Sequence, residues 1–278
     1  MGLYVGLMSG TSLDGVDGVL VAFEGEALAV RAHHHRPYDA ALRAELLALN
    51  ATGVNELHRA ALAANAVARA YAQVVAALLA AADVGAGEVR ALGAHGQTVR
   101  HRPQEFDATG YTLQLLNGAL LAELSHIDVI CDLRSRDIAA GGQGAPLVPA
   151  FHARRFAQAG QDVAVLNLGG IANLTLLPAD GPVRGFDCGP GNALLDLWAQ
   201  RHIGRPYDAG GRWAASGRVR PDWLAAWLAD PFFAKAPPKS TGRDLFHAGW
   251  LDARVSPGSD SADVMATLAE LKIGRAHV

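Results

Sequence analysis

Residues 6–17 read Gly6-Leu7-Met8-Ser9-Gly10-Thr11-Ser12-Leu13-Asp14-Gly15-Val16-Asp17, and the architecture expected for the whole chain is built around them. Apolar residues precede this polar segment from Leu3 and follow it to Phe23. Two apolar runs joined by a short segment with glycines predict the two strands of a β-hairpin with a polar tip. Gly10 and Gly15 can adopt backbone angles that are closed to other residues, as tight turns require.

The tip of this predicted hairpin suits a phosphate group. A loop of glycine, serine and threonine directs successive N–H groups into a shallow nest that binds anions. Asp14 and Asp17 would repel a bare phosphate, which indicates that a Mg²⁺ ion or a water molecule lies between. An ordinary hairpin turn that binds nothing is the alternative that the composition leaves open.

The chain has 278 residues, of which 50% are hydrophobic, and a formal net charge of -3. This length fits two domains or one large one, with enough apolar side chains for a large core. The charge balance argues against a general nucleic-acid-binding protein. Cys131 and Cys188 have neither the spacing of a metal site nor that of a disulfide framework.

The amino terminus and the most apolar helix both favour a cytoplasmic protein. Met1 is followed by an apolar, strand-like run without a basic start, so no signal peptide is expected. The helix predicted over residues 60–82 carries Asn65, Arg69 and Gln73, which would be costly at the middle of a membrane span. We therefore expect an amphipathic helix that packs inside the protein.

Three consecutive histidines, His33 to His35, follow a third apolar segment at residues 27–32. Successive side chains of a strand point to opposite faces, so these histidines are not expected to form one metal site.

Asn55 is predicted as the N-cap of a long helix that ends at Ala82. Further helices are predicted over residues 38–49, 118–124, 148–156, 193–202, 221–228 and 259–271, the last capped by Asp260 or Ser261.

Two predicted strands in the first half of the chain lead directly into polar loops. The strand at residues 89–94 ends in His95-Gly96-Gln97-Thr98, and the strand at 127–131 ends in a cationic loop with Arg134 and Asp137. Polar groups just past the carboxyl end of a strand are typical of ligand sites in α/β sheets. The cationic loop suits an anionic ligand, and a merely solvated loop is the alternative in both places.

The second half of the chain echoes the first. Strands are predicted at residues 163–168 and 171–177, joined by a Gly169-Gly170 turn, with Asn173 on the second strand. Two glycine hairpins, one in each half, indicate two related half-molecules that face each other across a cleft.

Asp187 follows a short predicted strand at residues 183–186 and precedes the helix predicted at 193–202. A carboxylate at a strand end beside a helix amino terminus is in a usual position for catalysis. The alternative is that Asp187 only caps the turn.

Six ordered segments together resemble the 1,6-anhydro-N-acetylmuramic acid kinases, within the actin/hexokinase/Hsp70-like ATPase superfamily. The segments are residues 6–17, 95–98, 134–149, 167–173, 186–192 and 239–244. The likeness covers the chain from Leu3 to about Leu271. It implies an α/β protein with a two-lobed actin-like ATPase fold and a ribonuclease-H-like mixed sheet in each lobe.

The resemblance also implies a division into lobes. Residues 1–131 would form the N-terminal lobe, with the first phosphate hairpin and part of the sugar site. Residues 132–271 would form an incomplete C-terminal lobe, with the second hairpin and the catalytic aspartate. Family members run on beyond this point, whereas here Gly274 stands where a helix former is expected. Residues 272–278 are therefore expected to be a non-native tail.

The implied activity belongs to peptidoglycan recycling. A kinase of this family uses ATP and Mg²⁺, opens the 1,6-anhydro bridge of 1,6-anhydro-N-acetylmuramic acid with water, and phosphorylates O6. The products are N-acetylmuramic acid 6-phosphate and ADP. The implied partners are the amino sugar and ATP, without nucleic acid or membrane, and the usual assembly is a homodimer.

Roles carry over from the family by position. Asp187 matches the catalytic base, and Asp137 is the second candidate for that role. Asp14 would also hold the metal. The remaining implied site residues are Gly10, Thr11, Ser12, Leu13, Asp14, Gly15, Val16 and Asp17 in the first phosphate loop, Gly169, Gly170 and Asn173 in the second, and His95, Gln97, Thr98, Arg134, Gln143 and Asn192 at the sugar.

Three other functions compete with this one. A truncated, inactive nucleotide-binding relative of the same superfamily is the main alternative. A hydrolase of another α/β fold is disfavoured because no Gly-x-Ser-x-Gly elbow is present, and the segment around Ser9 does not match one. An NAD-binding module is disfavoured because no G-x-G-x-x-G opens a helix after a strand.

Overall fold

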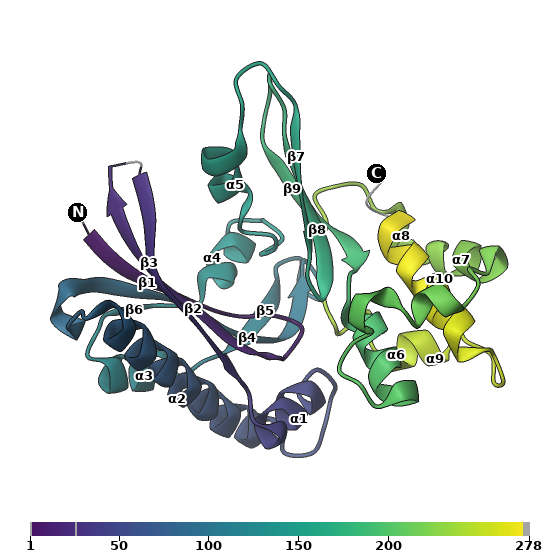
Figure 1. Cartoon of the computed structure of the whole chain (residues 1–278), viewed down its shortest axis with the longest axis horizontal. Helices are drawn as coiled ribbons and strands as arrows, with labels where there is room; N and C mark the ends of the chain where they lie inside the picture. The colour runs from purple at the N-terminus through teal and green to yellow at the C-terminus, as the bar shows by residue number, and fades with distance from the viewer. Residues whose placement is uncertain (1, 26, 275–278) are drawn as a thin grey trace. The chain divides into compact units, whose positions relative to one another are not determined.

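The computed structural model describes residues 2–25 and 27–274 (Figure 1). The chain forms two compact units that divide between Gly142 and Gln143. The lobe boundary expected from the resemblance, between residues 131 and 132, stays a prediction.

The first unit is built on a mixed β-sheet with the strand order β3-β2-β1-β4-β5, in which β6 also pairs with β4. β1, β2 and β3 are antiparallel neighbours, whereas β4 runs parallel to both β1 and β6. The predicted α/β class is therefore confirmed, and the predicted mixed sheet is confirmed for this unit, whereas the described sheet of the second unit is entirely antiparallel. The strands are β1 (Gly2–Ser9), β2 (Gly15–Glu24), β3 (Ala27–Pro37), β4 (Val89–Pro103), β5 (Gly110–Leu115) and β6 (Val129–Ile130).

The first hairpin has the predicted form. β1 and β2 pair from Gly2 opposite Phe23 to Met8 opposite Asp17, the last pair before the tip. The apolar side chains of one face, among them Val5, Leu7 and Leu20, are buried in the core of this unit. Alternation of apolar and polar residues thus fixes which face of the hairpin is covered.

The helix α2 (Glu56–Ala82) supplies much of that core, as Figure 1 shows below the sheet. It is long and apolar enough to cross a membrane by length and composition, yet Val67, Tyr71 and Leu78 on one face are completely buried in the unit. Asn55 precedes the helix as predicted, but its side chain makes no capping hydrogen bond. The other helices of the unit are α1 (Ala40–Ala48), the single turn η1 (Ala86–Glu88), α3 (Gly118–Ser125) and α4 (Leu133–Ala139).

Two predicted loops of the first unit are regular structure instead. β4 does not end before His95 but continues to Pro103, because its second half pairs antiparallel with β5. Arg134 and Asp137 lie in α4 and not in a loop. Both predictions were wrong because polar side chains were interpreted as the end of a strand or as a loop. The backbone N–H and carbonyl groups of β4 instead continue to pair with β5.

The second unit contains a three-stranded antiparallel sheet, β7 (Val163–Leu168), β8 (Ile171–Leu177) and β9 (Arg184–Pro190), in that order. The predicted second glycine hairpin is confirmed as β7 and β8. A separate core of aromatic side chains, including Trp198, Trp227 and Phe246, joins the helices that follow. These elements are α5 (Pro149–Phe156), α6 (Ala193–Ile203), η2 (Ala209–Gly211), η3 (Ala214–Ser216), α7 (Pro221–Leu228), α8 (Pro231–Ala234), α9 (Ala248–Asp252) and α10 (Ser261–Gly274).

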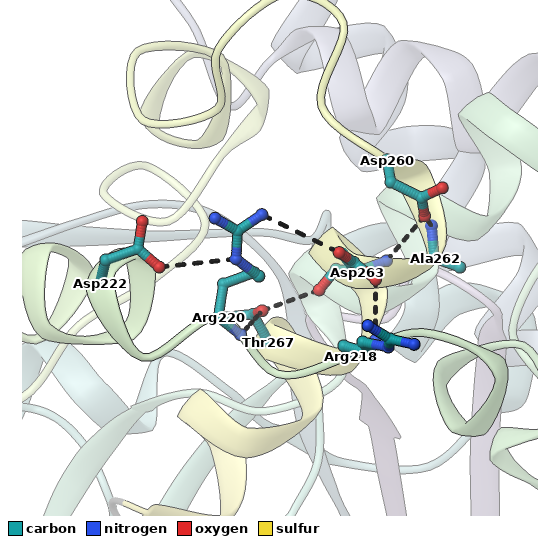
Figure 2. Close-up of polar contacts among 7 residues, drawn as sticks. All are labelled: Arg218, Arg220, Asp222, Asp260, Ala262, Asp263 and Thr267. Carbon is teal, nitrogen blue, oxygen red and sulfur yellow. Dashed lines mark hydrogen bonds and ion pairs between the residues drawn. The ribbon is translucent and has the colours of Figure 1, made fainter.

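Figure 2 shows how α10 is attached to the segment before α7. The Asp260 carboxylate accepts a hydrogen bond from the N–H of Asp263 (3.1 Å), so its predicted capping role is confirmed. The Asp263 carboxylate accepts from the N–H of Arg218 (2.8 Å), and the Thr267 hydroxyl oxygen accepts from the N–H of Arg220 (3.0 Å). Side chains of α10 thus satisfy backbone groups of a segment without regular structure.

The end of α10 differs from the expectation. The helix continues through Lys272 to Gly274, although a glycine at this position was expected to interrupt it. The remainder of the predicted tail, residues 275–278, lies outside the described residues.

Candidate active site

The tip of the first hairpin is a tight turn held by its own backbone. The N–H of Leu13 donates to the carbonyl of Gly10 (3.3 Å), and Leu13 adopts a left-handed φ of 58°. The Ser12 hydroxyl donates to Oδ1 of Asp14 (2.7 Å), and the Asp14 side chain is exposed. One turn therefore gathers five of the predicted phosphate-loop residues, Gly10, Thr11, Ser12, Leu13 and Asp14.

The last residues predicted for this loop lie in β2. Val16 is completely buried in the core, so only its backbone could meet a ligand. Asp17 is exposed, and its Oδ1 lies 3.1 Å from Nδ1 of His35 and 3.4 Å from Nε2 of His33. His33 and His35 therefore share a face of β3, in agreement with the predicted alternation.

The first hairpin is tied to β4 beneath its tip. Ser9 is buried, and its Oγ lies 2.8 Å from the carbonyl oxygen of Gly96 and 2.8 Å from the hydroxyl of Tyr71. The carbonyl can only accept, so Ser9 donates to Gly96 and Tyr71 donates to Ser9. Gln97 adds a bond from Nε2 to the carbonyl of Gly10 (3.0 Å). Hydrogen bonds of the Ser9, Tyr71 and Gln97 side chains and of the Gly96 carbonyl thus hold the turn against β4.

His95 and Arg134 form a direct contact within the first unit. Nε of Arg134 donates to Nε2 of His95 (2.8 Å), and Nδ1 of His95 lies 2.6 Å from the carbonyl oxygen of Gly96. Burial and, to a smaller extent, the positive charge of Arg134 lower the pKa of His95 to about 4. The imidazole is therefore neutral at physiological pH.

The next polar residues of β4 point to different neighbours, Gln97 to the first hairpin and Thr98 to β5. Gln114 Nε2 donates to the Thr98 hydroxyl oxygen (3.1 Å). The amide oxygen of Gln97 is buried and has no hydrogen-bond partner. A buried acceptor without a partner is costly, so a donor to this oxygen is expected, from either a bound water or a ligand. The structure thus brings His95 into contact with Arg134, whereas Gln97 and Thr98 bond to other residues. The assignment of these residues to a sugar site stays a prediction.

Asp137 lies near the carboxyl end of α4 and is partly buried. Its backbone carbonyl accepts from the N–H of Gly142 (2.8 Å), and a Cβ atom on Gly142 would lie 2.2 Å from Oδ2 of Asp137. The Asp137 carboxylate therefore packs directly against the backbone of Gly142, and a larger residue there would displace it.

The second glycine turn is fixed by the chain that follows β9. The carbonyl of Gly169 accepts from the N–H of Asn192 (2.8 Å), and the carbonyl of Gly170 accepts from the N–H of Gly191 (2.9 Å). The Asn192 side chain donates to the carbonyl of Leu168 (3.2 Å) and accepts from Nζ of Lys272 (3.2 Å). Because the turn's carbonyls are used in this way, its N–H groups are the part suited to phosphate.

Asp187 is only 4% exposed and lies within β9, not after the strand as predicted, because β9 stays paired with β8 as far as Pro190. Its N–H donates to the carbonyl of Lys239 (2.9 Å), and its Oδ2 accepts from the N–H of Thr241 (2.9 Å). One carboxylate oxygen is therefore held by a backbone donor. A carboxylate fixed in this way keeps its orientation.

Lys239 is also buried, and its backbone carbonyl is the group that accepts from the N–H of Asp187. Its Nζ is 3.3 Å from the carbonyl oxygen of Phe233 and 5.0 Å from the ring centroid of Phe232. Burial, together with the negative charge of Asp187 and against the positive charge of Lys239, raises the pKa of the Cys188 thiol to about 11. Cys188 is thus a protonated core residue and not a nucleophile.

Two buried oxygens without hydrogen-bond partners lie in the segments that surround Asp187. They are Oδ1 of Asn173, which is on the β8 residue opposite Asp187, and Oγ1 of Thr241. Next to Thr241, the Ser240 hydroxyl donates toward the Gln143 side chain (3.3 Å). Buried acceptors without a partner are costly, so a donor is expected beside Asp187, from either a bound water or a polar ligand.

The structure thus forms two groups of predicted residues, one in each unit. Ser9, Tyr71, Lys239 and Thr241 were not assigned roles from the sequence. Ser9, Lys239 and Thr241 lie in the resembling segments, which was the available signal. Tyr71 stands in the middle of an apolar helix and gave none.

Among residues 2–25 and 27–274 there is no cluster of three or more side chains that could hold a metal ion. Mg²⁺ does not require such a cluster, because it keeps several waters and is commonly held by one or two carboxylates together with substrate phosphates. The exposed Asp14 carboxylate at the hairpin tip fits that pattern.

A family model described as anhydro-N-acetylmuramic acid kinase matches residues 2–275. The likeness therefore extends past Leu271, where it was expected to fade. An anhydro-N-acetylmuramic acid kinase of Variovorax paradoxus is 66% identical over 275 residues, which cover 96% of this chain and 73% of the relative. One of Bordetella pertussis is 61% identical, with 97% and 71% covered. None of these findings supports the alternative of an inactive relative.

Solved structures are only distantly similar. The ethanolamine utilization protein EutJ of Carboxydothermus hydrogenoformans has a TM-score of 0.37 and 13% identity, with 96% of this chain and 82% of that chain covered. A Ppx/GppA family member of Aquifex aeolicus has a TM-score of 0.33 and 11% identity, with 97% and 89% covered. TM-scores this low carry no conclusion about this chain.

Proposed function

This chain belongs to the anhydro-N-acetylmuramic acid kinase family, and we propose that its two glycine turns bind the phosphates of ATP while Asp187 activates the water that opens the sugar. As a member of the family it is an ATP-dependent carbohydrate kinase of peptidoglycan recycling. Its proposed substrate is 1,6-anhydro-N-acetylmuramic acid, and its proposed products are N-acetylmuramic acid 6-phosphate and ADP.

The nucleotide is assigned to the two turns. Gly10 to Gly15 present a short, tightly turned backbone, and the N–H groups of such a turn suit phosphate oxygens. Gly169 and Gly170 form the matching turn of the second unit, with Asn173 two residues into the next strand. Phosphoryl transfer depends mainly on positioning and on neutralising charge, which two backbone turns can supply.

A divalent cation is assigned to Asp14. Its exposed carboxylate lies at the tip of the first turn, where the Ser12 hydroxyl holds one of its oxygens. Mg²⁺ bound there would neutralise charge on the phosphates of the nucleotide.

The chemistry at the sugar begins with the water. Asp187 accepts a proton from the water while the water oxygen bonds to the anomeric carbon and the bond from that carbon to O6 breaks. The freed O6 attacks the γ-phosphorus of ATP, and the bond from that phosphorus to the ADP oxygen breaks. Asp187 is preferred over Asp137 because it is almost fully buried and one of its oxygens is fixed by the N–H of Thr241.

The sugar is assigned to the group around Arg134. A guanidinium recognises a carboxylate through paired N–H donors, so Arg134 suits the lactyl carboxylate of the substrate. Gln97, Thr98, Gln143 and Asn192 are proposed to complete the sugar site. Buried acceptors such as the Gln97 amide oxygen suit sugar hydroxyl groups as donors.

The buried, backbone-held carboxylate of Asp187 is the observation that carries the proposal. The test incubates the purified chain with ATP and 1,6-anhydro-N-acetylmuramic acid and determines the product mass. We expect a sugar heavier by one phosphoryl group and one water. A product with the phosphoryl group but an intact bridge would contradict the water step, and no product would contradict the activity of the chain.

Location and assembly are also proposals. A reduced cytoplasmic enzyme that acts on small molecules fits the two unpaired cysteines and the net charge of -3. The resemblance implies a homodimer, which sedimentation of the purified chain would test.

A further inference from the structure

We propose that His95 is a positioning residue, which holds the guanidinium of Arg134 in the orientation that the sugar carboxylate requires and does not itself contact the sugar. The inference rests on the proposed role of Arg134. It changes the role of His95 from a direct sugar ligand to a residue that acts through another.

The hydrogen bonds of His95 define its tautomer. Its Nδ1 lies 2.6 Å from the carbonyl oxygen of Gly96, which can only accept, so Nδ1 carries the proton. Its Nε2 is then the bare nitrogen of a neutral ring, and it accepts from Nε of Arg134 (2.8 Å). Both polar atoms of the ring are thereby used within the protein, and none remains for the sugar.

The anchor of the ring is rigid. The Gly96 carbonyl accepts a second hydrogen bond from the buried Ser9 hydroxyl (2.8 Å), which in turn accepts from Tyr71 (2.8 Å). Both acceptor sites of this carbonyl are therefore occupied. Gly96 also has a φ of 77°, and a Cβ atom there would lie 3.0 Å from the carbonyl oxygen of Leu115. The imidazole is thus attached to a backbone that cannot shift freely.

The bond to Nε has a specific effect on Arg134. This side chain leaves α4 at its second residue, is only partly buried, and has a long, flexible stem. An acceptor aimed at Nε fixes the plane of the guanidinium. A site that is ordered before the ligand arrives loses less freedom on binding and therefore binds more tightly.

The kinetic test uses two matched variants. The amide oxygen of His95→Gln can take the place of Nε2, whereas the amide nitrogen of His95→Asn can take only the place of Nδ1. We expect His95→Asn to raise the KM for the anhydro-sugar by about tenfold, a cost of about 1.4 kcal/mol, while the KM for ATP changes by about twofold or less. His95→Gln is expected to stay within about threefold of the wild type for both substrates. Equal impairment of the two variants, or an unchanged KM for the sugar in both, would overturn the proposal.

A second measurement does not depend on activity. The ¹⁵N chemical shifts of the imidazole in the unmodified chain report which ring nitrogen carries the proton. We expect the neutral Nδ1–H tautomer at neutral pH, without added ligand. An Nε2–H tautomer or an imidazolium would overturn the proposal. The Nδ1–H tautomer in a chain that shows no sugar-dependent turnover would contradict the proposed function and still support the contact with Arg134.

Discussion

A Cβ atom on Gly15 would lie 2.2 Å from the carbonyl oxygen of Arg36, because the first residue of β2 crosses directly over the end of β3. Under 3.0 Å the backbone must move, so no other residue fits here without a shift. At Gly10, on the other side of the turn, the nearest atom would be the Ser12 hydroxyl oxygen at 3.6 Å, which is ordinary contact. The two glycines of the turn therefore serve different needs.

Gly15→Ala is expected to lower the free energy of unfolding by about 2 kcal/mol or more, through backbone displacement. Gly10→Ala is the matched control, which is expected to change it by about 1 kcal/mol or less and to raise the KM for ATP several-fold, because the added methyl group lies where phosphate approaches. Urea unfolding and initial-rate kinetics measure both. Equal destabilisation by the two variants would contradict the different roles of the glycines.

Arg134→Ala is expected to raise the KM for the anhydro-sugar by about tenfold to a hundredfold, since a charge-assisted contact to the lactyl carboxylate is lost. The KM for ATP is expected to change little. Steady-state kinetics with each substrate varied in turn measures the two effects. Equal increases for both substrates would refute the assignment of Arg134 to the sugar.

The stability of the fold is expected to depend on pH through His95. Its folded-state pKa is lowered to about 4 from an ordinary value of 6.5, first by burial and then by Arg134. The unfolded chain therefore binds a proton below pH 6.5 that the folded chain excludes down to pH 4. The stability associated with the neutral ring is fully present above the unfolded value and is lost as the pH falls through this window.

The slope from this one group is at most about 1.4 kcal/mol per pH unit, and less because the ring is partly exposed. Urea unfolding of the wild type and of His95→Gln across this window measures it. The variant is expected to lose stability less steeply on acidification. Parallel curves for the two proteins would show that His95 is not the group responsible.

Thr241→Val is expected to separate function from stability. Oγ1 of Thr241 is buried without a partner, so replacing it by a methyl group of similar shape is expected to leave the unfolding free energy unchanged or raised by about 1 kcal/mol or less. If the hydroxyl meets a ligand beside Asp187, kcat/KM is expected to fall about tenfold. Thr241→Ser, which keeps the hydroxyl, is the control. Full activity of the valine variant would remove Thr241 from the site.

The sequence predicted those features of the fold that depend on neighbouring residues. The two hairpins follow from apolar runs separated by glycines, and helices such as α7 follow from a proline start and a continuous apolar face. The ends of β4 and β9 were not predicted, because both strands continue through polar residues whose backbone groups are paired with distant strands. Local pattern does not contain that information.

The same distinction applies to the candidate site. Turn residues such as Gly10 and Gly170 could be assigned from the sequence, since their chemistry lies within a few residues. The Tyr71 hydroxyl could not, because its partner Ser9 is 62 residues away and a tyrosine in an apolar helix is usually a core residue. The contact of His95 with Arg134 likewise joins β4 to α4 across 39 residues.

The central claim is that Asp187 activates water while the glycine turns bind ATP independently of it. The most direct measurement combines ATP binding by calorimetry with sugar-dependent ADP release, in the wild type, Asp187→Asn and Asp137→Asn. Asp187→Asn keeps the size of the side chain and an acceptor for the N–H of Thr241. We expect it to bind ATP nearly as tightly as the wild type and to lose turnover by about a thousandfold or more, while Asp137→Asn retains turnover. Retained turnover in Asp187→Asn together with its loss in Asp137→Asn would contradict the claim and assign the base to Asp137.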